Sequence, residues 1–355
     1  GKSAGESEPI SDGVASSEVD VKRRSTTANK EYVDAKGPEM KEIFAEADTE
    51  RERRLSVRYS AKDQSSGRAS SSRRQSRGSA PFDRSRIGVH TKHGLRPGPR
   101  GQSAAKINQD RGCVCFPFGP ENSKSMMALF CVFDGHGAQG DKVSQYAATQ
   151  VQLVLEEHPE LESRPEKALM EAFVTVDTNL RRDSTIDAEL SGTTAVVVLV
   201  VIEAGTGKMI VYTANAGDSR ATIGRKAGGV KKPAAFDLSE DQKPDTPLEM
   251  ERIKKAGGYV SPPEVEWGGP ARVWIDASMT LPGLAMARSI GDHLVKTVGV
   301  TAQPVVKRYE IAENDQFMVM ASDGVWEFIE SPQCVELVDQ FIATSATEAC
   351  TRLIE

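Results

Sequence analysis

Residues 193–225 read TTAVVVLVVIEAGTGKMIVYTANAGDSRATIGR, and this stretch decides the fold class. Apolar and small residues alternate along it, and glycine-containing breaks fall at Gly205-Thr206-Gly207 and at Gly217-Asp218. Short apolar runs bounded by such turns are typical of strands joined by tight connections. The stretch therefore predicts three antiparallel strands arranged as a meander.

Other segments supply further strands and the helices that cover them. Continuous apolar runs at Met126–Phe133 and Asp315–Ser322 predict two buried strands. Apolar residues at three- and four-residue spacing predict helices over Asp141–His158, Arg164–Asp183 and Pro247 to about Gly257. Because strands and helix pairs come in separate runs, without strict strand–helix alternation, the chain predicts an α+β layered domain.

The first 85 residues differ in texture from the rest of the chain. They are rich in Ser, Arg, Glu and Gly and lack the apolar spacing of a packed core, so residues 1–85 are expected to form a disordered tail. Within it, Glu39–Leu55 is a good helix former that a partner could stabilise. From Arg51 to Arg100 there are fourteen Lys or Arg against three Asp or Glu, although the whole chain has a net charge of -6. This predicts a basic tail on an acidic domain that spans residues 86–355.

The tail also suggests partners. Ser56 and Ser76 each follow an arginine pair by two positions, a pattern that a basophilic kinase could recognise. A solvated tail without this role remains the alternative. Only Tyr59 and Phe82 provide aromatic rings near the basic run, so no nucleic-acid partner is expected.

Cysteine content and apolar run lengths indicate the compartment. The five cysteines have no spacing typical of a disulfide framework, which favours a reducing environment. The longest aliphatic run, Ala195–Ile202, is far too short to cross a membrane. We expect an intracellular protein, cytoplasmic or nuclear, without a transmembrane segment and monomeric.

Acidic residues recur at the ends of predicted strands. Asp134-Gly135-His136 and Asp323-Gly324 each follow a buried run, and Asp110 and Asp218 lie beside other predicted strands. Mg²⁺ and Mn²⁺ prefer carboxylate, backbone carbonyl and water oxygens, which such strand ends can present together. A single Asp-Gly is ordinarily a turn, and a single histidine such as His136 is ordinarily a loop residue. Their joint appearance with further motifs in a set order favours a metal site.

These motifs carry a family resemblance. In chain order they are KINQD (106–110), FCVFDGHG (130–137), SGTTAVVVLV (191–200), ANAGDSRA (214–221), LSEDQKP (238–244), ERIKKAGGYV (251–260), LAMARSIGD (284–292) and MASDGVWE (320–327). The series resembles the metal-dependent protein phosphatase 2C family of Ser/Thr phosphatases and covers about residues 86–355. The resemblance implies a four-layer αββα sandwich of two antiparallel sheets flanked by helices. It also implies hydrolysis of phosphoserine and phosphothreonine in proteins by a hydroxide that bridges two Mg²⁺ or Mn²⁺ ions.

The resemblance assigns roles position by position. Asp134 is expected to bridge the two ions, with the Gly135 carbonyl on one and Asp323 on the other. Asp110 is expected to act through a metal-bound water. Asp218 and Glu327 correspond to acids near a weaker third ion. His136 matches the proton donor to the leaving oxygen, and Lys106 lies where the family presents a basic residue to the phosphate. Asp292 either supports a site residue or is simply a turn acid, and the turn is favoured.

Two departures from the family pattern leave a second function open. Gln109 stands where many members have glutamate, and the sequence ends at Glu355, before the Asp-Asn motif that supplies a further ligand in the family. We therefore expect a fragment of a longer protein that lacks the final strands of the domain. A non-catalytic phosphatase-like module that binds or scaffolds partners is the alternative to an active phosphatase.

Overall fold

The computed structural model describes residues 55–59, 82, 84–97, 103–120, 122–264 and 269–355. Its larger sheet has the order β1-β4-β5-β7-β8-β15, and the short strands β6 and β14 extend it from β5. The strands of this sheet are β1 (Leu55–Tyr59), β4 (Asp110–Phe118), β5 (Met126–His136), β6 (Gly192–Thr193), β7 (Ala195–Ile202), β8 (Met209–Ala216), β14 (Ile290–Gly291) and β15 (Val305–Glu310). All pairings except β1 with β4 are antiparallel.

A second antiparallel sheet has the order β10-β9-β16. Its strands are β9 (Arg220–Arg225), β10 (Ala234–Asp237) and β16 (Asp315–Ala321). The helices are α3 (Gly140–Glu156), α4 (Pro165–Arg182), α5 (Pro247–Lys255), α6 (His293–Lys296), α7 (Asp323–Trp326), α8 (Ser331–Phe341) and α9 (Ala346–Ile354), with a 3-10 turn at Arg84–Arg86. The two long helices and the α5 start agree with the sequence prediction to within two residues.

Strand β7 shows how the two sheets and the helices share one core. Ala195, Val197 and Leu199 face α3 and α4, whereas Val196 and Val198 face the second sheet. All five are fully buried, because both faces of the strand are covered. Each fully buried aliphatic side chain contributes roughly 1.5–3 kcal/mol, which explains why this strand has no polar position.

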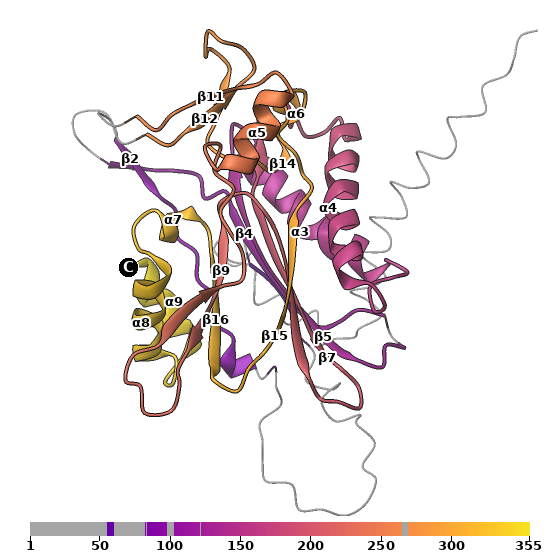
Figure 1. Cartoon of the computed structure of the whole chain (residues 1–355), viewed down its shortest axis with the longest axis vertical. Coiled ribbons are helices and arrows are strands. Elements are labelled where there is room, and N and C mark those ends of the chain that lie inside the picture. The colour runs from indigo at the N-terminus through magenta and orange to yellow at the C-terminus, as the bar shows by residue number, and fades with distance from the viewer. Residues whose placement is uncertain (1–54, 60–81, 83, 98–102, 121, 265–268) are drawn as a thin grey trace, which may run out of the picture. The chain divides into compact units, whose positions relative to one another are not determined.

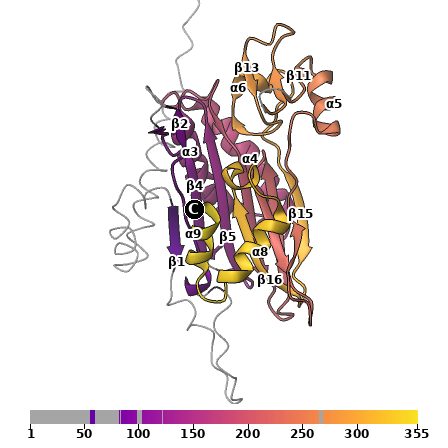
Figure 2. The same ribbon diagram turned by 90° about the vertical axis from the view of Figure 1, so that its left-hand side faces the viewer.

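The layers follow from these contacts. One apolar cluster joins α3 and α4 to the larger sheet, and a second lies between the two sheets. A third joins α7, α8 and α9 to β16 through residues that include Trp326, Cys334 and Val338. Figures 1 and 2 show the resulting order of helices, sheet, sheet and helices. The predicted αββα sandwich is confirmed.

The predicted three-strand meander is correct for its first two strands and wrong for the third. Strands β7 and β8 pair antiparallel as expected. The other edge of β8 is taken by β15, so β9 cannot pair there. The chain instead crosses at Gly217-Asp218, and β9 becomes the middle strand of the second sheet. This crossing places Asp218 between the two sheets.

Part of the expected N-terminal tail belongs to the fold. Leu55–Tyr59 form β1, which pairs parallel with β4, and Phe82 packs into the core between the sheets. The expectation of disorder therefore does not extend to these residues. The proposed helix at Glu39 and the serine at position 76 lie outside the described residues. The domain boundary at residue 86 stays a prediction.

Residues 245–264 and 269–284 form a small unit above the ends of the sheets, seen at the top of Figure 1. It contains α5 and the strands β11 (Tyr259–Ser261), β12 (Arg272–Trp274) and β13 (Pro282–Leu284), and we call it the flap. The flap packs on a core of its own that includes Ile253, Val273 and Val295. A hairpin of β2 (Leu95–Pro97) and β3 (Ser103–Ala105) pairs separately. Within the described residues, no helix is long and apolar enough to span a bilayer.

Candidate functional site

Asp110 and Asp134 face each other across two strands. Asp110 is the first residue of β4, and Asp134 lies near the end of β5, directly opposite it in the antiparallel register. Side chains of directly opposed residues lie on the same face of a sheet, with Cβ atoms about 4.5–5.5 Å apart. The strand pairing therefore brings two carboxylates together at one end of the larger sheet.

Asp323 reaches the same place from the second sheet. It follows the end of β16 and begins α7, and its neighbour Ser322 donates a hydrogen bond from Oγ to Oδ2 of Asp110 at 3.2 Å. Asp323 also lies close enough to Asp134 for its charge to raise the pKa of the Asp134 carboxyl. Three of the predicted metal-binding acids, Asp110, Asp134 and Asp323, thus converge from strands of both sheets. We call them the acid cluster.

The acid cluster holds more negative charge than its surroundings compensate. Burial, followed by the charges of Asp110 and Asp323, raises the pKa of Asp134 well above its ordinary value. Burial also raises the pKa of Asp110, although hydrogen bonds from Asp134 and Ser322 oppose the shift. Like charges in one buried site cannot all ionise without a compensating cation. The cluster is therefore electrostatically suited to bind cations.

The donor set fits a hard divalent cation. The acid cluster offers only oxygen atoms, which Mg²⁺ and Mn²⁺ prefer. Among the residues that the structure describes, no three His, Cys, Asp or Glu side chains lie close enough to enclose an ion by themselves. Mg²⁺ is ordinarily bound through one or two carboxylates and keeps several waters, so a closed cage of side chains is not required.

Gly135 follows Asp134 at a crowded position. A Cβ atom on it would lie 2.2 Å from the carbonyl oxygen of Gly140 and 2.8 Å from that of Gln109. Only glycine fits between these two backbones. The side chain of Gln109 donates from Nε2 to the carbonyl oxygen of Gly137 at 2.8 Å. In this chain Gln109 therefore braces the Gly135–Gly137 turn.

His136, the last residue of β5, pairs with Asp292. Its Nε2 lies 2.7 Å from Oδ2 of Asp292, which is 3% exposed. Burial would lower the pKa of His136, but the charge of Asp292 and its hydrogen bond raise the pKa above the ordinary value. The interpretation of Asp292 as a simple turn acid was wrong. Asp292 does occupy a turn, with a left-handed φ of 50°, but that turn aims its carboxylate at the histidine.

A glycine makes room for this pair. A Cβ atom on Gly192 of β6 would lie 2.1 Å from Oδ2 of Asp292 and 2.8 Å from Nε2 of His136. Gly192→Ala is therefore expected to separate the pair and to lower the free energy of unfolding by about 1–3 kcal/mol, measured by denaturant titration. If His136 is the proton donor that the family resemblance implies, activity should also fall about tenfold or more, because a misplaced general acid loses part of its contribution.

Gly228→Ala is the matched control for this substitution. Gly228 lies in an exposed turn, and a Cβ atom there would meet nothing within 4 Å. Equal stability and activity losses in the two variants would show that the space at Gly192 has no special role.

Lys106 and Glu327 lie at the wall of one cavity, together with the acid cluster. The cavity has a volume of about 1690 Å³, and its lining includes Lys106, Asp110, Asp134, Gly135, Asp323 and Glu327. Lys106 is exposed just before β4, and Glu327 is exposed at the end of α7. The structure therefore places these two residues in the lining of the same cavity as the acid cluster. Their predicted roles toward phosphate and metal stay predictions.

Asp218 lies apart from the cavity wall, in the turn between β8 and β9. Its Oδ2 accepts a hydrogen bond from Nζ of Lys243 at 2.7 Å. Burial would lower the pKa of Lys243, but the charge of Asp218 raises it. The neighbouring Ser219 shares a hydrogen bond of 2.6 Å with Thr194, whose hydroxyl accepts the backbone N–H of Asp134. The turn that carries Asp218 is thus linked to the acid cluster through Ser219 and Thr194.

Sequence reasoning missed three residues that shape this site. Asp292 pairs with His136, Lys243 pairs with Asp218, and Thr194 connects Ser219, the neighbour of Asp218, to Asp134. Each stands inside a motif that the sequence displays, SIGD, DQKP or SGTTA. The motifs marked the positions, but the pairings join residues far apart in the chain, so only the tertiary structure shows them.

The sequence is similar to proteins of a known family. The sequence profile described as Protein phosphatase 2C matches residues 96–355. The chain is 37% identical over 256 residues to "Probable protein phosphatase 2C 35" of Arabidopsis thaliana, which covers 67% of this chain and 70% of that protein. It is 32% identical over 259 residues to "Protein phosphatase 2C homolog 2" of Schizosaccharomyces pombe, covering 70% of this chain and 62% of that protein.

The fold is also found among solved structures. A serine-threonine phosphatase 2C from Toxoplasma gondii superimposes with a TM-score of 0.58 at 22% sequence identity, over 73% of this chain and 86% of that one. A sex determining protein of C. elegans superimposes with a TM-score of 0.54, over 76% of this chain and 62% of that one. At this identity the likeness concerns the fold. Because the family profile spans most of the chain and its relatives exceed 30% identity, the protein belongs to the protein phosphatase 2C family.

Proposed function

We propose that this protein hydrolyses phosphoserine and phosphothreonine in protein substrates and that it needs Mg²⁺ or Mn²⁺ to do so. The observation that carries the proposal is the acid cluster, in which Asp110, Asp134 and Asp323 line one cavity. Family membership supports a protein phosphatase, which acts on phosphorylated proteins.

The residues that would hold two cations are the carboxylates of Asp134 and Asp323, the backbone carbonyl of Gly135 and, through water, Asp110. When bound, the cations supply water activation and neutralise charge on the phosphoryl oxygens. Without them, the charges of the acid cluster would repel a phosphate dianion. The same acids that make the site would then prevent substrate binding.

The chain's own residues serve the leaving group. Asp292 holds Nε2 of His136 at 2.7 Å, and Nδ1 on the other side of the ring is buried. The charge of Asp292 and its hydrogen bond stabilise the imidazolium form and raise the pKa of His136 above its ordinary value. The imidazolium of His136 would give a proton to the seryl or threonyl oxygen as the bond of that oxygen to phosphorus breaks. A free hydroxyl side chain is the product.

Lys106 would position the substrate. Its exposed ammonium lies at the opening of the cavity that the acid cluster shares. A point charge there would attract a phosphoryl oxygen and hold it beside the acids. The buried cysteines take no part, because water rather than a thiolate attacks phosphorus.

The second candidate is a non-catalytic module that binds phosphorylated partners. It is favoured by one observation, that no three acidic, His or Cys side chains among the described residues close around an ion. A basophilic kinase acting on Ser56 and Ser76, an intracellular location and a monomeric state remain proposals.

Metal removal separates the two candidates. Hydrolysis of phosphoserine and phosphothreonine peptides should require added Mn²⁺ or Mg²⁺, stop with EDTA and recover when excess metal is restored. Phosphate release measured with and without metal provides the test. A pure binding module would retain phosphopeptide affinity but release no phosphate under any of these conditions. Metal-independent hydrolysis would contradict the proposed mechanism.

A further inference from the structure

Asp218 is a buried carboxylate with one of its two oxygens engaged. The residue is 2% exposed, and its Oδ2 accepts the Lys243 ammonium at 2.7 Å. Its Oδ1 is buried and has no hydrogen-bond partner among the residues that the structure describes. A buried carboxylate requires compensation of its charge, and Lys243 provides it here.

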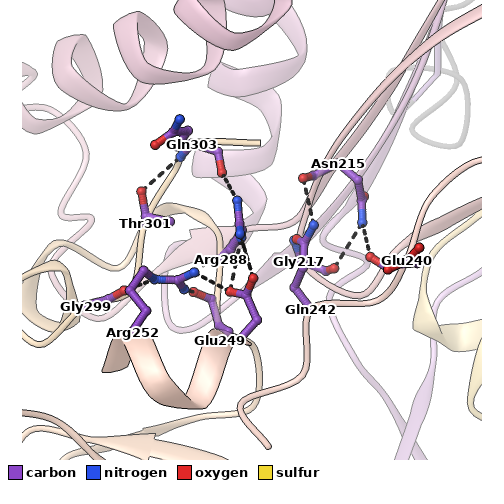
Figure 3. Close-up of polar contacts among 11 residues, drawn as sticks. Asn215, Gly217, Glu240, Gln242, Glu249, Arg252, Arg288, Gly299, Thr301 and Gln303 are labelled. Atoms are coloured by element: carbon purple, nitrogen blue, oxygen red, sulfur yellow. Dashed lines mark hydrogen bonds and ion pairs between the residues drawn. The ribbon is translucent and has the colours of Figure 1, made fainter. Parts of the chain in front are cut away.

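Lys243 is held in place by the residue before it. Figure 3 shows Gln242 clamped to the turn that carries Asp218. The backbone N–H of Gly217 donates to Oε1 of Gln242 at 2.7 Å, and the N–H of Gln242 donates to the carbonyl oxygen of Gly217 at 3.0 Å. The Gln242 Nε2 also donates to the carbonyl oxygen of Asn215 at 3.1 Å. Because Gly217 precedes Asp218 and Gln242 precedes Lys243, the clamp fixes the two charged residues side by side.

Further hydrogen bonds connect this clamp to α5 of the flap. The backbone N–H of Ala287 donates to the carbonyl oxygen of Gln242 at 2.8 Å, and Arg252 of α5 donates to the carbonyl oxygen of Ala287 at 2.8 Å. Arg252 and Arg288 both pair with the buried Glu249, as Figure 3 shows for this network. The backbone at Lys243 is therefore held in place by several hydrogen bonds. Because the Lys243 ammonium is tethered to this backbone, its effective concentration beside Asp218 is high.

We propose that Lys243 acts as a tethered cation that neutralises the Asp218 carboxylate and thereby excludes a divalent ion from that carboxylate. The inference rests on the proposed metal dependence of the acid cluster. Like charges repel, so an ion that approaches Asp218 must displace the ammonium or accept its repulsion. The chain accordingly binds divalent ions at the acid cluster and leaves Asp218 to its lysine.

Binding of Mn²⁺ to the whole chain tests this inference. The number of bound ions and their dissociation constants are measured by isothermal titration calorimetry and by the EPR signal of free Mn²⁺. Lys243→Gln is expected to bind one Mn²⁺ more than the wild type, or to bind the weakest ion about tenfold more tightly. Lys243→Arg, which keeps the charge, should bind as the wild type does. Adding Asp218→Asn to Lys243→Gln should remove the gain.

Two further variants keep the test decisive. Lys226→Gln is the matched control, because Lys226 pairs with Asp339 at the same 2.7 Å distance and with similar exposure of the lysine. It should leave Mn²⁺ binding unchanged. Asp218→Asn alone should also bind as many ions as the wild type, and it covers the case in which Lys243→Gln fails to fold.

The outcomes separate this inference from the proposed function. Loss of one ion in Asp218→Asn, or unchanged binding in a folded Lys243→Gln, would overturn the role of Lys243 while leaving the acid cluster as the metal site. A wild-type chain that binds no Mn²⁺ would overturn both the proposed metal dependence and this inference.

Discussion

Asp134→Asn is expected to lower phosphopeptide hydrolysis by about 10³-fold or more, because the substitution removes the carboxylate that faces both Asp110 and Asp323. The same change should raise the melting temperature in metal-free buffer. The acid cluster contains repelling buried charges, and a neutral amide relieves them. An increase of about 1 kcal/mol in the free energy of unfolding corresponds to a melting temperature about 2–4 °C higher in a domain of this size.

Adding Mn²⁺ should reverse the order of stability. Cations should raise the melting temperature of the wild type and have little effect on Asp134→Asn, which thermal unfolding scans with and without metal can measure. Asp245→Asn is the control, since Asp245 is exposed and lies outside the acid cluster. A metal-free Asp134→Asn less stable than the wild type would indicate that Asp134 is a structural residue with compensated charge.

The second large effect is expected at the histidine. His136→Gln should lower the turnover of a phosphoserine peptide by about 10²–10⁴-fold, the usual contribution of a positioned general acid. It should affect p-nitrophenyl phosphate much less, because nitrophenolate leaves without needing a proton. Asp292→Asn should show the same substrate dependence to a smaller extent, since it keeps the imidazole but removes its anionic partner. The measurement compares the turnover of each variant on the two substrates.

This comparison separates proton donation from a structural role. A variant that damaged only the fold or the metal site would lose both activities in the same proportion. Equal losses on the two substrates would therefore remove His136 from the role of proton donor. The matched variant His158→Gln, at the end of α3, changes a histidine that pairs with Glu171 and should affect neither substrate.

Local sequence pattern anticipated a large part of the fold. The helices α3 and α4 follow from apolar residues that recur every three or four positions, because that spacing lines one face of a helix. Strand β7 follows from an unbroken aliphatic run, because a strand covered on both faces needs no polar position. Acids followed by glycine marked Asp134 and Asp323, which the structure brings together. These signals could be read because each concerns a few neighbouring residues.

The tertiary structure decided which distant groups meet. His136 and Asp292 are 156 positions apart, and no local pattern could show that the turn acid reaches the histidine. Strand β9 left the predicted meander because β15, which comes later in the chain, occupies the edge of β8. The pairing of Lys243 with Asp218 likewise depends on a clamp between separate segments. The sequence by itself determined the elements and the kinds of chemical group at their ends, since these depend on local periodicity and turn preference. Which charges face one another depends on how the sheets pack, and only the folded chain determines that.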